Sequence, residues 1–484
     1  MRSPIAIAVF LLVSAPCFTF AQNKPNIVLL MAKGLTMENV PIYGEVAAPA
    51  PNLDEMAGHG IIFDNVYSCA STSSGAISSL LTGCYAPSLG MSGQIEPSSV
   101  KLPEGIHLFP YYLREAGYHT SCSNLDCGYA GEDTVWDWVN ENLEEWKNRE
   151  GPSKPFFHCI VVAGSGKSTL RPESASANID EIRKVDNVLG ELLKILKEDG
   201  QLDNTFVFCL GLNGESLPGT KAVEYRVPMA VYIPDRWMEL SPLRKGSRCS
   251  AVVSFNDLAS TLLNLADVKI PPYMDGSPVL GKDMWSGELA ERDMAVCYED
   301  RPCGQTCDRV VRKQDYLYSR SFYPCRPDTG SGKVYEESRE KLYLLGKDRS
   351  LTENLVNNPD YGQILDFMRS LLNDKMLEDM DLGIIPEALW MDSISDIEAY
   401  KSKIRGKYAD YLAAANMSRK SFKEISRQLK ASLKSDDEII LYWALVACNT
   451  YGQEASGMKR RICELFKNGT PLVRSQAASY LTRF

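Results

Sequence analysis

Long apolar runs alternate with helix-like segments through the first 290 residues of the chain. Apolar residues occupy 26–31, 156–163, 205–211 and 229–233 almost without interruption, which is typical of strands buried on both faces of a parallel sheet. Between the second and third runs, apolar positions from Ile179 to Leu196 follow three-and-four spacing, and Gly200 ends this predicted helix. The alternation predicts an α/β domain at 22–290, with helices on both faces of a parallel-type central sheet.

The pattern changes after residue 290. Strands are predicted at 315–321 and 341–345, a loop at 322–334 and a helix at 361–377, which suits a smaller α+β subdomain at 291–382. The remaining residues, 383–484, predict a tail of helices at 395–415, 419–433, 436–451, 455–467 and 471–482. Pairs of short helices with this spacing are typical of HEAT-like repeats, which stack into a solenoid.

The first 21 residues have the pattern of a secretory signal peptide. Arg2 precedes an apolar core at 5–13, and the small residue Ala21 ends the segment. The core is shorter than the run of about 20 residues that a membrane-spanning helix needs. We expect cleavage after Ala21, export to the periplasm or the cell exterior, and no membrane span.

Composition narrows the class of function. A net charge of -10 over 484 residues argues against a nucleic-acid-binding protein, because such proteins usually present a basic face. The chain has 14 cysteines, and in an exported protein many cysteines predict disulfides. Cys303, Cys307 and Cys325 lie close together in sequence and suit a loop disulfide. The sharper interpretation, a metal site at the first two, lacks a histidine or second cysteine pair nearby.

Residues 164–169, Gly-Ser-Gly-Lys-Ser-Thr, superficially match a phosphate-binding loop. That motif requires a glycine five residues before its Gly-Lys-Ser, so that backbone N–H groups can surround the phosphate. Val161 holds this position here and belongs to the predicted strand. We therefore interpret the segment as an ordinary loop at a strand end.

Serine and threonine crowd residues 71–74, immediately before an apolar segment with helical character. Such hydroxyl residues are favoured at helix N-termini for structural reasons alone. Taken by itself, the segment is compatible with a nucleophilic serine and with a capped helix start.

Several motifs resemble those of the sulfatase family, and they occur in the family's order over about 24–380. They include Lys24-Pro-Asn-Ile-Val-Leu-Leu30, Ala50-Pro-Asn-Leu-Asp54, Leu80-Leu-Thr-Gly83, Arg226-Val-Pro228 and Leu342-Tyr-Leu-Leu-Gly346. The resemblance implies an alkaline-phosphatase-like α/β core followed by a small C-terminal subdomain. It also implies a chemistry in which a formylglycine, made from cysteine or serine, attacks sulfur beside a calcium ion held by acidic residues.

Most positions that carry this chemistry in the family hold other residue types here. The family's Asp-Asp pair after the first strand corresponds to Lys33 and Gly34, and its later Asp-Asn pair corresponds to Leu212 and Asn213. Calcium prefers several oxygen ligands with negative charge among them, so only Asn213 remains of this metal set. Lys33 is either a solvated loop lysine or an ammonium that replaces the metal ion.

The family's nucleophile motif, Cys/Ser-x-Pro-x-Arg, corresponds to residues 73–77. Ser73 stands at the nucleophile, whereas Gly75 and Ile77 replace the proline and the arginine. Lys221 is the candidate for the family's last substrate-binding lysine. Other catalytic positions of the family correspond to Leu125, Cys127 and Gly166. We therefore interpret Ser73 as a helix-start residue.

Three functional hypotheses follow. The favoured one is a catalytically degenerate sulfatase homologue, exported, which binds a sulfated carbohydrate or a partner protein and needs no cofactor. The second is an active sulfuric-ester hydrolase, with Ser73 converted to formylglycine and calcium held from non-standard positions. The third is a hydrolase of the wider superfamily that acts on another ester with an unmodified hydroxyl nucleophile.

Overall fold

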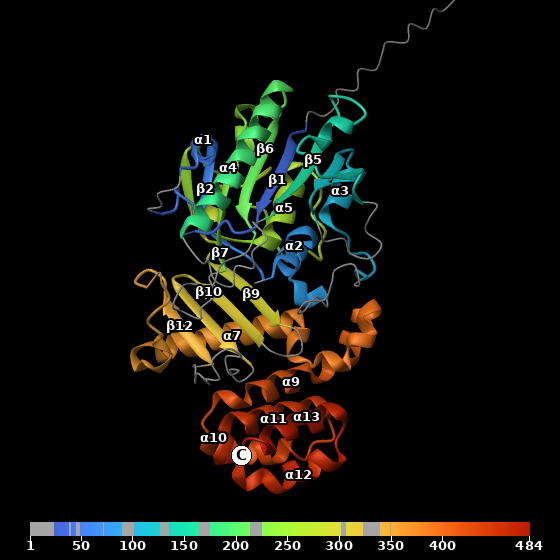
Figure 1. Ribbon diagram of the computed structural model, residues 1–484, viewed down its shortest axis with the longest axis vertical. Coiled ribbons are helices and arrows are strands. Elements are labelled where there is room, and N and C mark those ends of the chain that lie inside the picture. Colours follow the sequence, from blue (N-terminus) through green and yellow to red (C-terminus); the bar gives the residue numbers. More distant parts are fainter. Residues whose placement is uncertain are drawn as a thin grey trace, which may run out of the picture.

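Two sheets and a helical tail follow one another along the long axis of the molecule (Figure 1). The computed structural model describes residues 24–37, 40–44, 49–70, 72–89, 101–125, 135–163, 175–212, 225–301, 306–322, 339–348 and 350–484. The expected signal peptide at 1–21 and the glycine-rich loop at 164–169 lie outside these residues. In the described part of the chain, no helix combines the length and the apolar character needed to cross a membrane.

The large sheet has eight strands in the order β4-β3-β5-β1-β6-β7-β2-β8. Their bounds are β1 (Asn26–Ala32), β2 (Gly60–Tyr67), β3 (His119–Ser123), β4 (Trp138–Asn140), β5 (Phe156–Val162), β6 (Thr205–Gly211), β7 (Arg226–Tyr232) and β8 (Ser247–Ser254). β7 is antiparallel to β6 and β2, and the other neighbours are parallel. The prediction of a parallel-type sheet is confirmed, with one reversed strand that its apolar run could not reveal, because β7 is as buried as its neighbours.

Helices cover both faces of this sheet. Successive side chains of β1 enter two separate apolar clusters, which explains why its sequence shows no alternation. The first cluster includes α2 (Ser73–Thr82), α3 (Phe109–Glu115) and α5 (Phe255–Leu265). The second includes α1 (Pro51–Gly58) and α4 (Ala175–Glu198), and Gly200 follows α4 with a φ of 64°.

A four-stranded antiparallel sheet follows the short helix α6 (Ser286–Ala290), in the order β12-β11-β10-β9. Its strands are β9 (Met294–Arg301), β10 (Thr306–Lys313), β11 (Tyr316–Ser321) and β12 (Glu340–Leu344), and α7 (Gly362–Asp379) packs on it. The predicted strands at 315–321 and 341–345 and the predicted helix are confirmed. β9 and β10 were not predicted. Charged residues interrupt the apolar pattern of β10, and β9 ends in the charged residues Glu299–Arg301.

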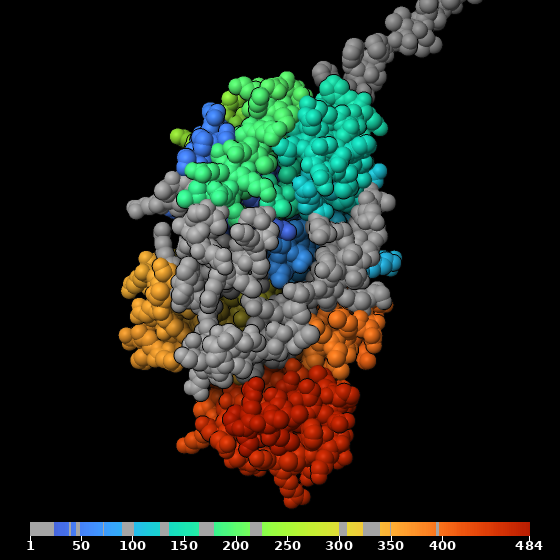
Figure 2. All heavy atoms as spheres, viewed as in Figure 1, coloured from blue at the N-terminus to red at the C-terminus, as the bar shows by residue number. Residues whose placement is uncertain are grey.

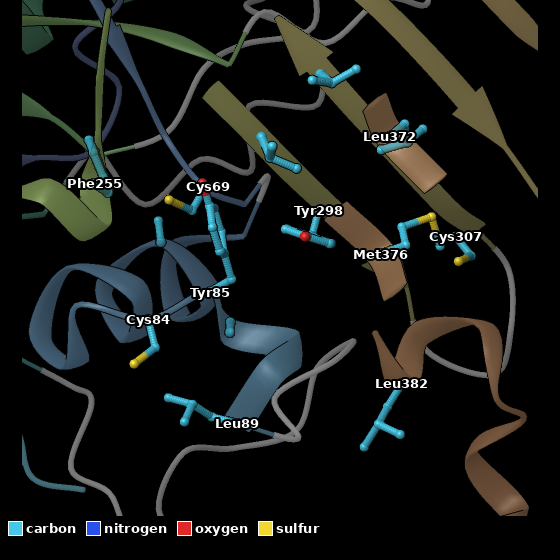
Figure 3. Packing of buried hydrophobic residues seen from close by; sticks show 14 of the residues in the cluster. Cys69, Cys84, Tyr85, Leu89, Phe255, Tyr298, Cys307, Leu372, Met376 and Leu382 are labelled. Carbon is cyan, nitrogen blue, oxygen red and sulfur yellow. The ribbon is translucent and has the colours of Figure 1, made fainter. Parts of the chain in front are cut away.

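The two sheets meet at a closely packed seam. The N–H of Tyr298 in β9 donates to the carbonyl of Cys69, which lies just beyond β2 (2.9 Å). The Tyr298 and Tyr85 rings lie 5.3 Å apart between centroids, and Figure 3 shows Met376 and Leu372 of α7 on the other side of Tyr298. The Tyr298 hydroxyl also donates to the Asp379 carboxylate.

The tail contains the predicted helices. They are α8 (Ile397–Ile404), α9 (Tyr408–Ala415), α10 (Phe422–Ser432), α11 (Glu438–Tyr451), α12 (Lys459–Asn468) and α13 (Pro471–Leu481). α11 is largely buried and contacts α9, α10 and α13. Figure 2 shows the tail as a block at one end of the molecule. Its description as HEAT-like repeats stays a prediction.

The described cysteines form no disulfide framework of the kind that the cysteine count predicted. Cys69, Cys84, Cys122, Cys209, Cys249, Cys297 and Cys448 are buried free thiols, and Cys463 is partly exposed. Burial raises the pKa of Cys209 and of Cys448 to about 12, so these thiols are unreactive. Cys303 and Cys325 lie outside the described residues, and the loop disulfide stays a prediction.

Candidate functional site

The candidate site lies where the parallel strands of the large sheet end. Because β1, β2, β5 and β6 run in the same direction, their last residues lie at one edge, which we call the strand-end edge. This edge faces the second sheet (Figure 1). Ligands of open α/β sheets generally bind beyond the carboxyl ends of the strands. The sequence positions after β1, β2 and β6 are the ones that correspond to the family's catalytic motifs.

Lys33 and Gly34 follow β1 directly. The Lys33 N–H donates to the carbonyl of Val162 (3.0 Å), and its side chain is exposed. This exposure fits a solvated lysine and disfavours an ammonium that replaces a buried metal ion. Gly34 has a φ of 81°, and a Cβ atom there would lie 1.9 Å from Oε2 of Glu181. A larger residue therefore requires both a strained backbone and a displaced Glu181.

Glu181 on α4 places a carboxylate at this edge, which the sequence pattern did not predict. Its side chain is 8% exposed and lies against Gly34, the second position of the family's acidic pair. One signal was available in the sequence. Glu181 precedes Val185 by four residues, so both lie on the same face of the predicted amphipathic helix. An acid on the apolar face is unusual enough to mark a position of interest.

Leu212 continues β6 beyond its last residue. Its N–H donates to the carbonyl of Ala32 (2.9 Å), and its side chain is fully buried in the apolar cluster beneath the sheet. Asn213 and Lys221 lie outside the described residues. The position that corresponds to the family's metal-binding aspartate is therefore filled by a core leucine.

Ser73 is the first residue of α2, and Thr72 is the N-cap. The Thr72 Oγ1 accepts a hydrogen bond from the Gly75 N–H (3.2 Å), which satisfies one backbone donor of the first turn. The interpretation of Ser73 as a helix-start residue is thus supported by its place in this turn. Ile77, at the position of the family's arginine, is 3% exposed and belongs to the apolar core.

The two buried histidines lie within strands and offer no proton donor at the strand-end edge. His158 in β5 is fully buried, with Nδ1 2.9 Å from Oγ of Ser121, and burial lowers its pKa to about 3. His119 begins β3 and therefore lies at the opposite edge of the sheet. Burial lowers the pKa of His119, although Asp137 lies 3.7 Å away and opposes this shift.

The described residues at the family's metal positions do not fit calcium. This ion takes six to eight oxygen ligands in proteins, whereas Lys33, Gly34 and Leu212 carry no side-chain oxygen. Glu181 supplies one carboxylate beside Gly34. Within the described ranges, no group of three or more histidine, cysteine, aspartate or glutamate side chains is arranged to hold a metal ion.

Taken together, the mixed eight-stranded sheet, its helices on both faces, the second antiparallel sheet and a site at the strand ends define an alkaline-phosphatase-like architecture. A family model for the sulfatases matches residues 25–156 and 139–268. The chain belongs to the sulfatase family.

Characterised relatives agree with this assignment. An ulvan-active sulfatase from Formosa agariphila is 23% identical, with 76% of this chain and 77% of that protein covered. An arylsulfatase from Clostridium perfringens is 21% identical, over 72% of this chain and 94% of that protein. Human N-sulphoglucosamine sulphohydrolase is 22% identical, over 77% and 93%.

Solved structures show the same fold. The crystal structure of Ps i-CgsB in complex with k-i-k-neocarrahexaose has a TM-score of 0.57 at 18% identity, covering 72% of this chain and 92% of that one. The structure of BT4656 with its substrate D-glucosamine-2-N,6-O-disulfate has a TM-score of 0.58 at 16% identity, covering 74% and 98%.

Proposed function

We propose that this protein is an exported sulfatase homologue that binds a sulfated carbohydrate without hydrolysing it. The observation that carries the proposal is the pair of positions at the ends of β1 and β6. Gly34 packs on Glu181, and Leu212 is a fully buried core residue. Acidic ligands for a divalent cation are replaced at both positions.

Loss of the cation removes the largest contribution to catalysis in this class of reaction. A bound cation stabilises the negative charge that develops on the sulfate group as the ester bond breaks. The nucleophile motif has changed in the same direction, because Ile77 is a core residue at the arginine position and Gly75 replaces the proline. These changes support binding over turnover.

A sulfated carbohydrate is the ligand class that the relatives and the site both favour. The relatives include an ulvan-active sulfatase and N-sulphoglucosamine sulphohydrolase, and Lys33 exposes a cation at the strand-end edge. A cationic side chain suits the permanent negative charge of a sulfate ester. The helical tail offers a further surface for a partner protein, and the first 21 residues support export.

The test combines calcium titration with glycan binding. The mature protein is treated with a chelator and titrated with calcium by calorimetry. It is then titrated with a sulfated ulvan oligosaccharide and with the desulfated form, while released sulfate is measured. We expect no calcium binding at millimolar concentration, binding of the sulfated form only, and no sulfate release.

Two variants test whether Lys33 contributes to glycan binding. Lys33→Ala should weaken binding of the sulfated oligosaccharide by about tenfold, since one charge-assisted contact is lost, whereas the exposed Lys430→Ala on α10 should not. Tight binding of one calcium ion per chain together with sulfate release would instead support the active alternative. In that case, mass spectrometry of the peptide that contains Ser73 should reveal formylglycine.

A further inference from the structure

A cavity of about 190 Å³ lies between the two sheets, beside the end of β2. We call it the inter-sheet cavity. A single water molecule needs only about 10–15 Å³ of such volume, so the space is large enough for a chemical group. Its polar lining residues are Asn65 and Tyr67 of β2, Tyr225 and Arg226 at the start of β7, and Arg312 and Asp315 of the β10–β11 hairpin.

Arg312 is a buried cation that forms no ion pair with an acidic side chain of the described residues. Its side chain belongs to β10 and is 7% exposed. Nε donates to the carbonyl of Gln314 (3.0 Å), and the guanidinium lies over the Tyr67 ring, 5.3 Å from its centroid. Nη1 is buried and has no hydrogen-bond partner among the residues that the structure describes. A buried donor of this kind is costly unless something satisfies it.

Arg309, three residues earlier in the same strand, shows the usual solution. It is fully buried and pairs with the fully buried Asp381. No acidic side chain among the described residues forms such a pair with Arg312. The described part of the chain supplies no anion for Arg312, and the cavity beside it has the room to admit one.

The rest of the lining agrees with an anionic occupant. Arg226 adds a second guanidinium to the lining. In the antiparallel pairing of β2 with β7, Arg226 lies opposite Tyr67. The Tyr225 hydroxyl is already used as a donor to Glu299 (2.9 Å). Among the described lining residues, Asp315 carries the acidic side chain. It is exposed and lies in the turn between β10 and β11. The described lining residues therefore include two arginines and one aspartate.

We propose that the inter-sheet cavity binds an oxyanion, held by Arg312 and Arg226. A guanidinium offers a planar fork of N–H donors that matches sulfate and carboxylate oxygens. Sugars carry such a group either as a sulfate ester or as the carboxylate of a uronic acid. The cavity lies beside the end of β2, which β6 and β7 separate from β1 and Lys33, so its occupancy does not depend on whether the protein hydrolyses sulfate esters.

Calorimetric titration at constant ionic strength tests the proposal. The probes are sodium sulfate, glucose 6-sulfate, glucuronic acid and glucose, against a sodium chloride background. We expect sulfate to bind and glucose not to bind. Preference for glucose 6-sulfate identifies a sulfate-ester site, and preference for glucuronic acid identifies a carboxylate site. Failure of all three anions to bind would overturn the proposal.

Variants assign the binding to this cavity. Arg312→Gln should weaken anion binding by at least about tenfold, because a charged hydrogen-bonding partner is removed. Asp315→Asn should tighten it a few-fold, because a nearby negative charge is lost. Arg405→Gln, an exposed change in the tail, is the matched control and should have no effect.

The Asp315 variant keeps the proposal testable if Arg312→Gln does not fold. Arg312→Gln could fail to fold, because the side chain is buried, and circular dichroism would detect this. Asp315 is exposed, so its asparagine variant should fold normally. Tighter binding by Asp315→Asn supports the cavity, whereas unchanged binding in every variant that folds would place the anion elsewhere and overturn the proposal.

Discussion

Several positions that carry charged side chains in the sulfatase family hold buried apolar residues or glycine in this protein. Leu212 and Ile77 are buried side chains at positions where the family has an aspartate and an arginine, and Gly34 makes room for Glu181. The residue types were visible in the sequence. Their burial and the contact between Gly34 and Glu181 were not, because both depend on how α4 and the sheet pack together.

His158 provides a prediction at the residue scale. Its pKa is lowered to about 3 in the folded protein, whereas an unfolded histidine titrates near pH 6.5. Between these values the unfolded chain binds the proton and the folded protein does not, so stability falls as the pH falls below about 6.5. We expect the free energy of unfolding to drop by about 2 kcal/mol from this group between pH 7 and pH 5.

Chemical denaturation of the wild type and of His158→Leu at several pH values checks this prediction. Other groups also titrate in this range, so the measured quantity is the difference between the two proteins. The variant should lack the contribution of about 2 kcal/mol. An identical pH dependence in both proteins would mean that folding does not lower the pKa of His158.

At the scale of elements, α2 illustrates how a structural role can resemble a catalytic one. The hydroxyl-rich segment before it matched both a nucleophile motif and a helix start. In the structure the Thr72 hydroxyl accepts the Gly75 N–H, and Gly83, with a φ of 72°, ends the helix. The local sequence thus supplies both termini of the helix.

Thr72→Ala should therefore destabilise the protein by about 1 kcal/mol, the usual cost of removing an N-cap side chain. Thr72→Ser keeps the hydroxyl oxygen and should remain close to the wild type. The measurement is the midpoint of denaturant unfolding. Equal stability of all three proteins would show that the Thr72 side chain does not cap α2 in solution.

The charged residues of β10 explain why its sequence did not predict a strand. β10 carries Arg309 and Arg312 as buried residues, so its sequence reads as polar although its environment is not. Long-range partners make this burial tolerable, as the pair of Arg309 with Asp381 shows. A local pattern of apolar residues cannot anticipate a partner 72 residues away.

At the scale of the whole molecule, the parts predicted as separate units share one continuous apolar core. A single cluster of buried side chains extends from the large sheet through the second sheet to α13 in the tail. Polar contacts reinforce it: Asp381 pairs with Arg309, the Tyr408 hydroxyl donates to the Asp381 carbonyl (2.7 Å), and the Trp443 indole donates to the Ile384 carbonyl (2.8 Å).

Asp381→Ala should destabilise the whole molecule. Removing one partner of a fully buried ion pair leaves the other charge buried, which typically costs about 3–5 kcal/mol. The loss should appear as a lower midpoint of a single cooperative transition, monitored by calorimetry and tryptophan fluorescence. Because the core is shared, we expect both probes to report the same transition.

Asp366→Ala is the matched control. Asp366 also pairs with an arginine, Arg369, but its side chain is 77% exposed, and exposed pairs contribute at most about 1 kcal/mol. Similar losses in the two variants, or separate transitions for the tail and the sheets, would contradict the role assigned to Asp381 in joining them.

The sequence by itself determined the class of fold, the main strands and helices, and the replacement of most sulfatase motif residues. These properties depend on local apolar periodicity and on the identity of residues at aligned positions. The tertiary structure alone decided that β7 is reversed, that Glu181 lies against Gly34, and that Arg312 lines a cavity without an acidic partner among the described residues. Each of these depends on contacts between segments far apart in the chain, and no local pattern encodes such contacts.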